Sequence, residues 1–162
     1  HILLYKPQEA ANYKEGSNRA RITSAVITGI YMLGDNFSSK GSLPGGEQAR
    51  EKARTMVTNQ EINAIARLGK SFYPVEGYTA ESPEKAESVY MLDTEKYVYI
   101  AIFNFDISTP KQGKLNMERI GCKKNKNIKG KELWTSTPVF SDSNNLPYIV
   151  PPQDVRVYRI EK

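Results

Sequence analysis

A β-hairpin is predicted by the stretch SVYMLDTEKYVYIAIFNF, which runs from Ser88 to Phe105. Two runs rich in β-branched and aromatic residues, 89–92 and 97–105, flank a polar turn. A turn of this length is common between hairpin strands. The second run has almost no polar interruption, which is typical of a strand covered on both faces. We therefore expect 97–105 to lie in the middle of an antiparallel sheet.

The rest of the chain after this hairpin is also predicted to be β-structure. Strands are expected at 88–92, 96–105, 114–120, 131–135, 137–141, 147–150 and 154–161. Short strands separated by turns at this spacing favour a sandwich. In the last strand, hydrophobic residues alternate with Arg156 and Arg159 apart from the doublet Val157-Tyr158, which predicts a half-exposed final strand with both arginines outward.

The part before the hairpin is predicted to be helical. Apolar residues at helical spacing indicate a helix from 18 to about 30, with Ser17 as its N-cap. A second helix is expected over 47–57. The sequence TNQE at 58–61 fits a capping box, in which the threonine and the glutamate each bond a backbone amide, and Gly69 ends the short helix that it opens.

A short buried strand is predicted between the first two helices, at 31–36. It ends in the polar pair Asp35-Asn36, and a βα-barrel places its site residues where strands end. The alternative is that Asp35 caps a turn or the next helix, and the sequence alone favours this second interpretation.

The composition is that of an ordinary globular protein. Hydrophobic residues make up 39% and charged residues 25% of the 162 residues, and the longest apolar run, 25–33, is too short to span a bilayer. We therefore expect no membrane partner. The single cysteine, Cys122, excludes a disulfide framework and a thiolate metal site, and the single histidine, His1, excludes histidine-based catalysis within this chain. No metal and no cofactor is expected.

The net charge of +5 comes largely from one segment. Five lysines lie within nine residues: Lys123, Lys124, Lys126, Lys129 and Lys131. They form either a phosphate-binding loop or a solvated hairpin tip. Because no aromatic residues alternate with them to stack on bases, we favour the hairpin tip and expect no nucleic-acid partner.

Carboxylate-driven glycoside hydrolysis is the only enzyme chemistry for which the chain offers side chains. A retaining hydrolysis needs two carboxyl groups about 5–5.5 Å apart. Asp35 is the single candidate in a suitable setting, because the nearby glutamates lie on predicted helix faces or in the predicted cap. A complete catalytic site is therefore not predicted. Trp134 is a candidate for stacking on a sugar ring, although a lone tryptophan in a strand more often covers a sheet.

The order of these segments resembles the end of the catalytic barrel and the C-terminal β-sandwich of α-galactosidases (melibiases). The resemblance covers residues 17 to 161 and rests on these motifs: GDNF at 34–37, TNQEINAI at 58–65, FYPVE at 72–76, the strand ending in Phe-Asn at 103–104, ELWT at 132–135 and PPQDVRVYRI at 151–160. It implies an α+β chain in which helices of a βα-barrel end, residues 1–76, precede an antiparallel sandwich, residues 77–162.

The resemblance also implies a function for a longer parent enzyme. The family's retaining chemistry uses two aspartates from earlier barrel strands, and neither motif occurs here. Asp35 and Asn36 match only a substrate-side position after barrel strand eight, where Asn36-Phe37 departs from the usual Asp-Leu or Asp-Asp. The fragment is therefore expected to be inactive alone, to bind carbohydrate only through the parent enzyme, and to have a stabilising sandwich.

Two other functions are compatible with the sequence. A stand-alone carbohydrate-binding or interaction module predicts exposed aromatic residues on one sheet face, for which only Trp134 is a strong candidate. A structural accessory domain predicts no ligand. A barrel remnant would also leave the apolar helix faces of 17–68 without their partners. These faces would then pack on the sandwich in a rearranged way, associate with another copy, or be disordered. The start at His1 is interpreted as internal to a longer gene product, so the compartment is not predicted. A periplasmic or extracellular parent is compatible with the resemblance.

Overall fold

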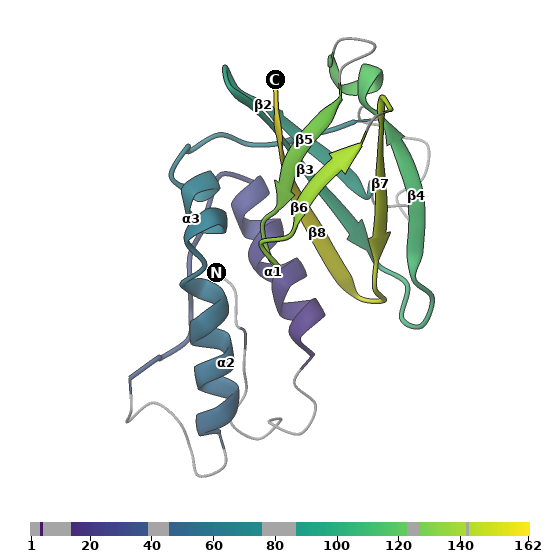
Figure 1. Ribbon diagram of the computed structural model, residues 1–162. Coiled ribbons are helices and arrows are strands. Elements are labelled where there is room, and N and C mark those ends of the chain that lie inside the picture. The colour runs from purple at the N-terminus through teal and green to yellow at the C-terminus, as the bar shows by residue number, and fades with distance from the viewer. Residues whose placement is uncertain (1–3, 5–13, 39–45, 76–86, 123–126, 142) are drawn as a thin grey trace.

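The computed structural model describes residues 4, 14–38, 46–75, 87–122, 127–141 and 143–162 (Figure 1). The elements in chain order are α1 (Glu15–Ile27), α2 (Glu47–Val57), α3 (Gln60–Ala66), β1 (Tyr73–Pro74), β2 (Val89–Asp93), β3 (Tyr97–Asn104), β4 (Lys111–Asn116), a 3-10 helix (Met117–Ile120), β5 (Ile128–Glu132), β6 (Pro138–Ser141), β7 (Asn145–Val150) and β8 (Asp154–Glu161). Helices precede strands, which confirms the predicted α+β class.

The strands form two sheets that lie face to face. The larger sheet has the order β1-β2-β3-β8-β5-β6, and the smaller one pairs β4 with β7. Neighbouring strands in both sheets are antiparallel. Figure 1 shows the three helices gathered on one side of the strands. The molecule thus has three layers, with the six-stranded sheet between the helices and the small sheet.

Strand β3 lies in the centre of the larger sheet, paired with β2 on one side and β8 on the other. Its side chains alternate between two hydrophobic clusters. Tyr99 and Phe103 pack with the helices, whereas Val98 and Ile102 pack with the small sheet. A strand buried on both faces needs apolar residues at every position, so the prediction from its sequence is confirmed.

Strand β8 is central as well, which corrects the predicted half-exposed final strand. It lies between β3 and β5. Val157 faces the helical cluster and Tyr158 faces the opposite cluster, and this two-sided burial explains the apolar doublet. The two arginines are not on a solvated face either: the side chains of Arg156 and Arg159 are 19% and 29% exposed and both are ion-paired.

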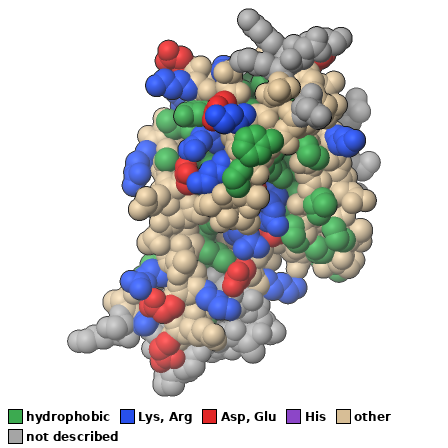
Figure 2. Space-filling model, viewed as in Figure 1, with side chains coloured by type: hydrophobic (Ala, Val, Ile, Leu, Met, Phe, Trp, Pro, Cys, Tyr) green, Lys and Arg blue, Asp and Glu red, His purple; other side chains and the backbone are tan. Residues whose placement is uncertain are grey.

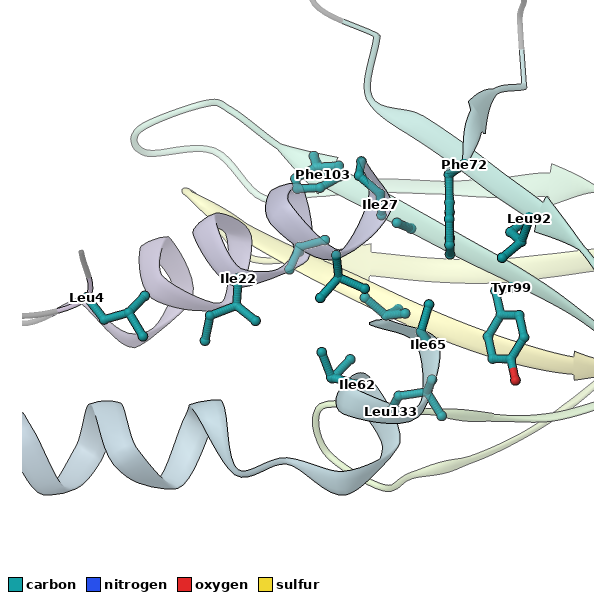
Figure 3. Packing of buried hydrophobic residues seen from close by; sticks show 14 of the residues in the cluster. Leu4, Ile22, Ile27, Ile62, Ile65, Phe72, Leu92, Tyr99, Phe103 and Leu133 are labelled. Atoms are coloured by element: carbon teal, nitrogen blue, oxygen red, sulfur yellow. The ribbon is translucent and has the colours of Figure 1, made fainter. Parts of the chain in front are cut away.

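The helical layer packs on the sheet through a continuous hydrophobic cluster (Figure 3). Ile22 of α1 and Ile62 of α3 are almost fully buried, at 0% and 1% exposure. They meet Phe103 of β3 and Leu133, which follows β5, in the same cluster. The predicted division at residues 76 and 77 falls in or beside the segment outside the described residues, and it stays a prediction.

The helix ends differ from those predicted. Helix α1 begins at Glu15, with Lys14 and not Ser17 as its N-cap. It ends at Ile27 because Gly29 adopts a φ of +77°, which a glycine tolerates and a continuing helix does not. The N-cap of α3 is Asn59, whose side chain accepts a bond from the Ile62 amide, so the predicted capping box is wrong.

Several strand bounds also differ from those predicted. The predicted strand 114–120 is β4 at 111–116 followed by the 3-10 helix, and the predicted strand 131–135 is β5 at 128–132 followed by a turn. In that turn Glu132 accepts bonds from the amide and hydroxyl of Thr135, at 2.7 Å each. Of the five lysines, Lys129 and Lys131 lie in β5, and the other three lie outside the described residues.

Candidate functional site

Asp35 is hydrogen-bonded to Leu4, the one described residue before Lys14. Its Oδ2 accepts a hydrogen bond from the amide of Leu4 at 2.9 Å, and the Leu4 carbonyl accepts one from Asn18 Nδ2 at 2.6 Å. The N-cap of α2 is Gly46, so Asp35 does not cap that helix. Asn36 accepts the amide of Ser38 at 3.0 Å in a local turn.

Three apolar residues before Asp35 are exposed: Ile30, Met32 and Leu33, at 66%, 60% and 41%. Tyr31 is half-buried and packs against the helical cluster. The predicted buried strand at 31–36 is therefore wrong, and no described element covers the three exposed side chains. A run of apolar residues left open in this way is typical of a surface that another part of a protein covers.

Trp134 lies in the turn between β5 and β6 rather than in a strand. Its indole Nε1 donates a hydrogen bond to Thr23 Oγ1 of α1 at 3.1 Å. The half-buried ring borders a small cleft of about 260 Å³. The other described residues that line this cleft are Glu15, Arg19, Lys52, Thr55, Met56 and Asn59. Neither Asp35 nor Asn36 is among them, so the predicted substrate-side residues do not line this cleft with Trp134.

We expect Trp134→Phe to lower the free energy of unfolding by about 1 kcal/mol, because it removes the bond to Thr23 and keeps an aromatic ring. Urea denaturation followed by circular dichroism measures this change. Trp134 is the only tryptophan, so its fluorescence in the native chain also reports on stacking. A spectral shift on titration with hexoses would establish Trp134 as a sugar platform, and we expect no such shift because its polar edge is engaged by α1.

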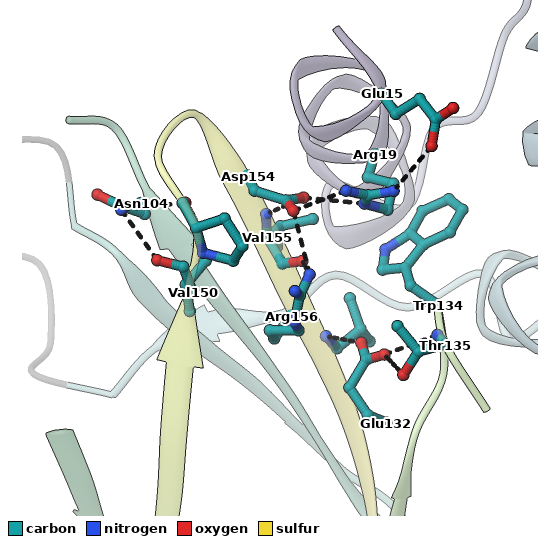
Figure 4. A network of polar contacts seen from close by, with 12 residues as sticks. Glu15, Arg19, Asn104, Glu132, Trp134, Thr135, Val150, Asp154, Val155 and Arg156 are labelled. Carbon is teal, nitrogen blue, oxygen red and sulfur yellow. Dashed lines mark hydrogen bonds and ion pairs between the residues drawn. The ribbon is translucent and has the colours of Figure 1, made fainter. Parts of the chain in front are cut away.

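An ion-pair network that the sequence did not predict joins α1 to β8 (Figure 4). The carboxylate of Asp154 is almost fully buried and accepts two hydrogen bonds from Arg19, at 2.9 and 2.7 Å. It also accepts the amide of Val155 at 2.7 Å and Arg156 Nη1 at 3.1 Å. Arg19 in turn lies 3.7 Å from Glu15. A bidentate arginine–carboxylate pair of this kind holds the two side chains in one relative orientation and also contributes binding energy.

Charge in this network shifts the ionisation of Asp154. Burial opposes the charged carboxylate, but hydrogen bonds from Arg19 and the Val155 amide, with the charges of Arg19 and Arg156, outweigh it and hold the pKa of Asp154 below its ordinary value. The side-chain hydrogen bond with Asp154 raises the pKa of Arg19 against the opposing effect of burial. Both groups are therefore charged at neutral pH.

A second ion-pair cluster joins α3 to the sheet. Glu61 accepts bonds from Lys131 at 2.9 Å and Arg159 at 2.7 Å, and the hydrogen bond from Lys131 is the largest cause that lowers the pKa of Glu61. The Arg159 guanidinium also lies 5.2 Å from the ring centre of Tyr97. Both clusters connect helices to strands, so these polar residues stabilise the contact between the layers.

Within the described residues, no group of three or more His, Cys, Asp or Glu side chains is placed to hold a metal ion. No helix in the same part of the chain is both long and apolar enough to cross a lipid bilayer.

Comparison with known proteins gives a likeness of fold without a likeness of sequence. No protein-family model matches the chain, and no curated protein sequence matches it. Solved structures do match. α-Galactosidase I from Mortierella vinacea superposes with a TM-score of 0.69 at 12% identity, over 91% of this chain and 36% of that enzyme.

Two further enzymes show the same fold. The GH27 β-L-arabinopyranosidase from Geobacillus stearothermophilus matches with a TM-score of 0.64 at 16% identity, over 93% of this chain and 31% of its own. The isomalto-dextranase from Arthrobacter globiformis T6 matches with 0.68 at 13% identity, over 91% and 24%. The chain thus spans about a third or less of the length of these glycoside hydrolases, and it has the fold of that part of them.

Proposed function

We propose that this chain is the C-terminal part of an α-galactosidase-like glycoside hydrolase and that it stabilises the catalytic barrel. The observation that carries the proposal is the fold match, which takes in more than nine-tenths of this chain and about a third of α-galactosidase I. The order of helices followed by a sandwich agrees with the motifs GDNF at 34–37 and TNQEINAI at 58–65.

The exposed side chains of Ile30, Met32 and Leu33 support this proposal. They lie shortly before Asp35, where the resemblance puts the last strand of a barrel. In the parent enzyme the remaining barrel strands would cover Ile30, Met32 and Leu33. Asp35 and Asn36 would then lie at the substrate side of the barrel, and carbohydrate would reach this chain only through the parent enzyme.

The contacts between the layers support a stabilising role. The sheet packs on α1 and α3 through the hydrophobic cluster and through two buried or half-buried ion-pair clusters around Asp154 and Glu61. Helices that belong to the barrel end would thereby be held by the sandwich. The chemistry itself would depend on two carboxylates supplied by the missing part of the barrel.

The proposal is tested by the gene and by activity together. We expect the reading frame to extend several hundred residues upstream of His1, with aspartates at the ends of barrel strands. The full-length product is expected to hydrolyse an aryl α-galactoside with retention, and the 162-residue chain to show no hydrolysis. A reading frame that starts within a few residues of His1, or turnover by the chain alone, would refute the proposal.

A further inference from the structure

A groove of about 710 Å³ lies where the two sheets separate, beside β6 and β7. In Figure 2 hydrophobic side chains gather over β6 and over the end of β7, with basic side chains between them. The residues that line the groove come from five strands and the β5–β6 turn: Gln112, Gly113, Lys114, Glu132, Thr135, Thr137, Val139, Pro147, Tyr148, Ile149, Arg156 and Tyr158. Its volume lies within the range of small-molecule sites, about 300–1,000 Å³.

One wall of the groove is an aromatic ring held in a fixed position. Tyr148 is paired with Gly113 across β4 and β7. A Cβ atom at Gly113 would lie 2.5 Å from the Tyr148 hydroxyl oxygen and 2.8 Å from its Cζ, so the ring rests directly on the glycine backbone. The neighbouring Ile149 is 64% exposed and, as the next residue of the strand, points to the opposite face of β7. The Tyr148 ring packs against the cluster between the sheets and gives the aromatic surface on which the C–H face of a sugar ring can pack.

The polar groups of the groove are mostly uncommitted donors. Lys114 makes no ion pair or hydrogen bond with any described residue. Arg156 uses only Nη1 in the bonds recorded for it, to Asp154 and to the Val155 carbonyl. Burial raises the pKa of Tyr158 to about 12, so its hydroxyl remains a donor at neutral pH.

The acidic group that borders the groove is already saturated. Glu132 is 4% exposed. One of its oxygens accepts the Val157 amide at 3.0 Å, and the other accepts the amide and hydroxyl of Thr135. Both carboxylate oxygens of Glu132 therefore already have hydrogen-bond partners. The donors that remain unpaired in the groove favour a ligand that brings acceptors and negative charge.

We propose that this groove binds an acidic saccharide, a pyranose oligosaccharide with a carboxylate on at least one ring. The ring face would pack on Tyr148, and the carboxylate would pair with the free guanidinium nitrogens of Arg156 and with Lys114, which also borders the groove. Such a site would be separate from any barrel active site, and the inference does not rest on the proposed enzyme function.

The test is calorimetric titration of the 162-residue chain at low salt with a hexuronate trisaccharide such as trigalacturonate. The neutral trisaccharide with the same linkage is the reference ligand. We expect saturable binding of the acidic ligand and at least tenfold weaker binding of the neutral one. Salt screens ion pairs, so 0.5 M NaCl should lower the affinity for the acidic ligand. Amide signals of residues 112–114, 148 and 149 should shift in two-dimensional NMR spectra.

Variants locate the binding. Lys114→Gln should weaken binding of the acidic ligand about fivefold, as loss of a solvent-accessible ion pair does, and Lys70→Gln, an equal change of charge on the exposed Lys70, should leave it unchanged. Tyr148→Leu should weaken the binding of both the acidic and the neutral trisaccharide. No saturable binding, equal affinity for the neutral ligand, or full affinity in Lys114→Gln would each overturn the proposal. Since Lys114 is exposed, its variant tests the site even if Tyr148→Leu fails to fold.

Discussion

Asp154→Ala is expected to lower the free energy of unfolding by about 3 kcal/mol, near the lower end of the range for a buried ion pair that loses one partner. The substitution removes the acceptor of four hydrogen bonds, from Arg19, the Val155 amide and Arg156. It leaves the Arg19 guanidinium between α1 and β8 with only the distant contact to Glu15. Urea denaturation followed by Trp134 fluorescence measures the change.

A matched control is available on the surface of α2. Glu51 is 49% exposed and pairs with Arg54 at 2.8 Å. Because exposed ion pairs contribute little, Glu51→Ala should change the free energy of unfolding by no more than about 0.5 kcal/mol. Equal effects of Asp154→Ala and Glu51→Ala would show that the network in Figure 4 does not hold the helices to the sheet.

The pH dependence of stability follows from the same carboxylate. Its pKa is lower in the folded chain than the value of about 3.9 for an unperturbed aspartate. The stabilisation is therefore fully present above the unfolded pKa and is lost as the pH falls through the folded pKa. Below about pH 4 the native chain should lose stability faster than Asp154→Ala, and the difference between their stabilities should narrow.

The hairpin was predictable because local composition carried its information. Strand β3 is apolar at nearly every position, and this pattern needs no knowledge of its partners to indicate burial on both faces. Strand β8 was misassigned because Arg156 and Arg159 interrupt its apolar run. Their partners, Asp154 and Glu61, become neighbours only when the layers assemble. Ion pairs between residues far apart in sequence leave no local signal.

The candidate site was also predictable only in part from the sequence. The identity of Asp35 and Trp134 as unusual residues could be read from the sequence, but their partners Leu4 and Thr23 could not. The groove was missed entirely, since it depends on how two sheets diverge. Gly113 in the middle of β4 was the one available signal, because a glycine inside a strand often marks a close approach of another group.

Residues 77–162 expressed alone should not reach the native state at room temperature. The truncation removes α1 and α3, which cover one face of the six-stranded sheet. The apolar side chains that lose this cover belong to Tyr99, Ala101, Phe103, Val155 and Val157. Each large apolar side chain contributes about 1.5–3 kcal/mol on burial, and whole domains are stable by only about 5–15 kcal/mol.

The measurement is a comparison of the truncated and full chains by thermal denaturation, near-UV circular dichroism and binding of a hydrophobic dye. We expect the full chain to unfold in one transition and residues 77–162 to bind dye and lack fixed tertiary structure. A truncated chain that melts at the same temperature as the full chain would contradict this expectation and would establish the predicted boundary as that of an independent domain.

A further variant distinguishes two effects of the truncation: exposure of the apolar sheet face, and loss of the other contacts that the helices make. In residues 77–162, replacing Tyr99 and Phe103 by threonine introduces β-branched residues that favour strands and removes two exposed aromatic rings. If the uncovered apolar face is the cause, these substitutions should reduce dye binding and aggregation. They should not restore full stability, because the ion pairs from Asp154 to α1 and from Lys131 and Arg159 to Glu61 of α3 remain absent. The same substitutions in the full chain should be strongly destabilising, since there both rings are buried against α1 and α3. Opposite effects of one pair of substitutions in the two chains would show that the helical layer and the sandwich share a single core.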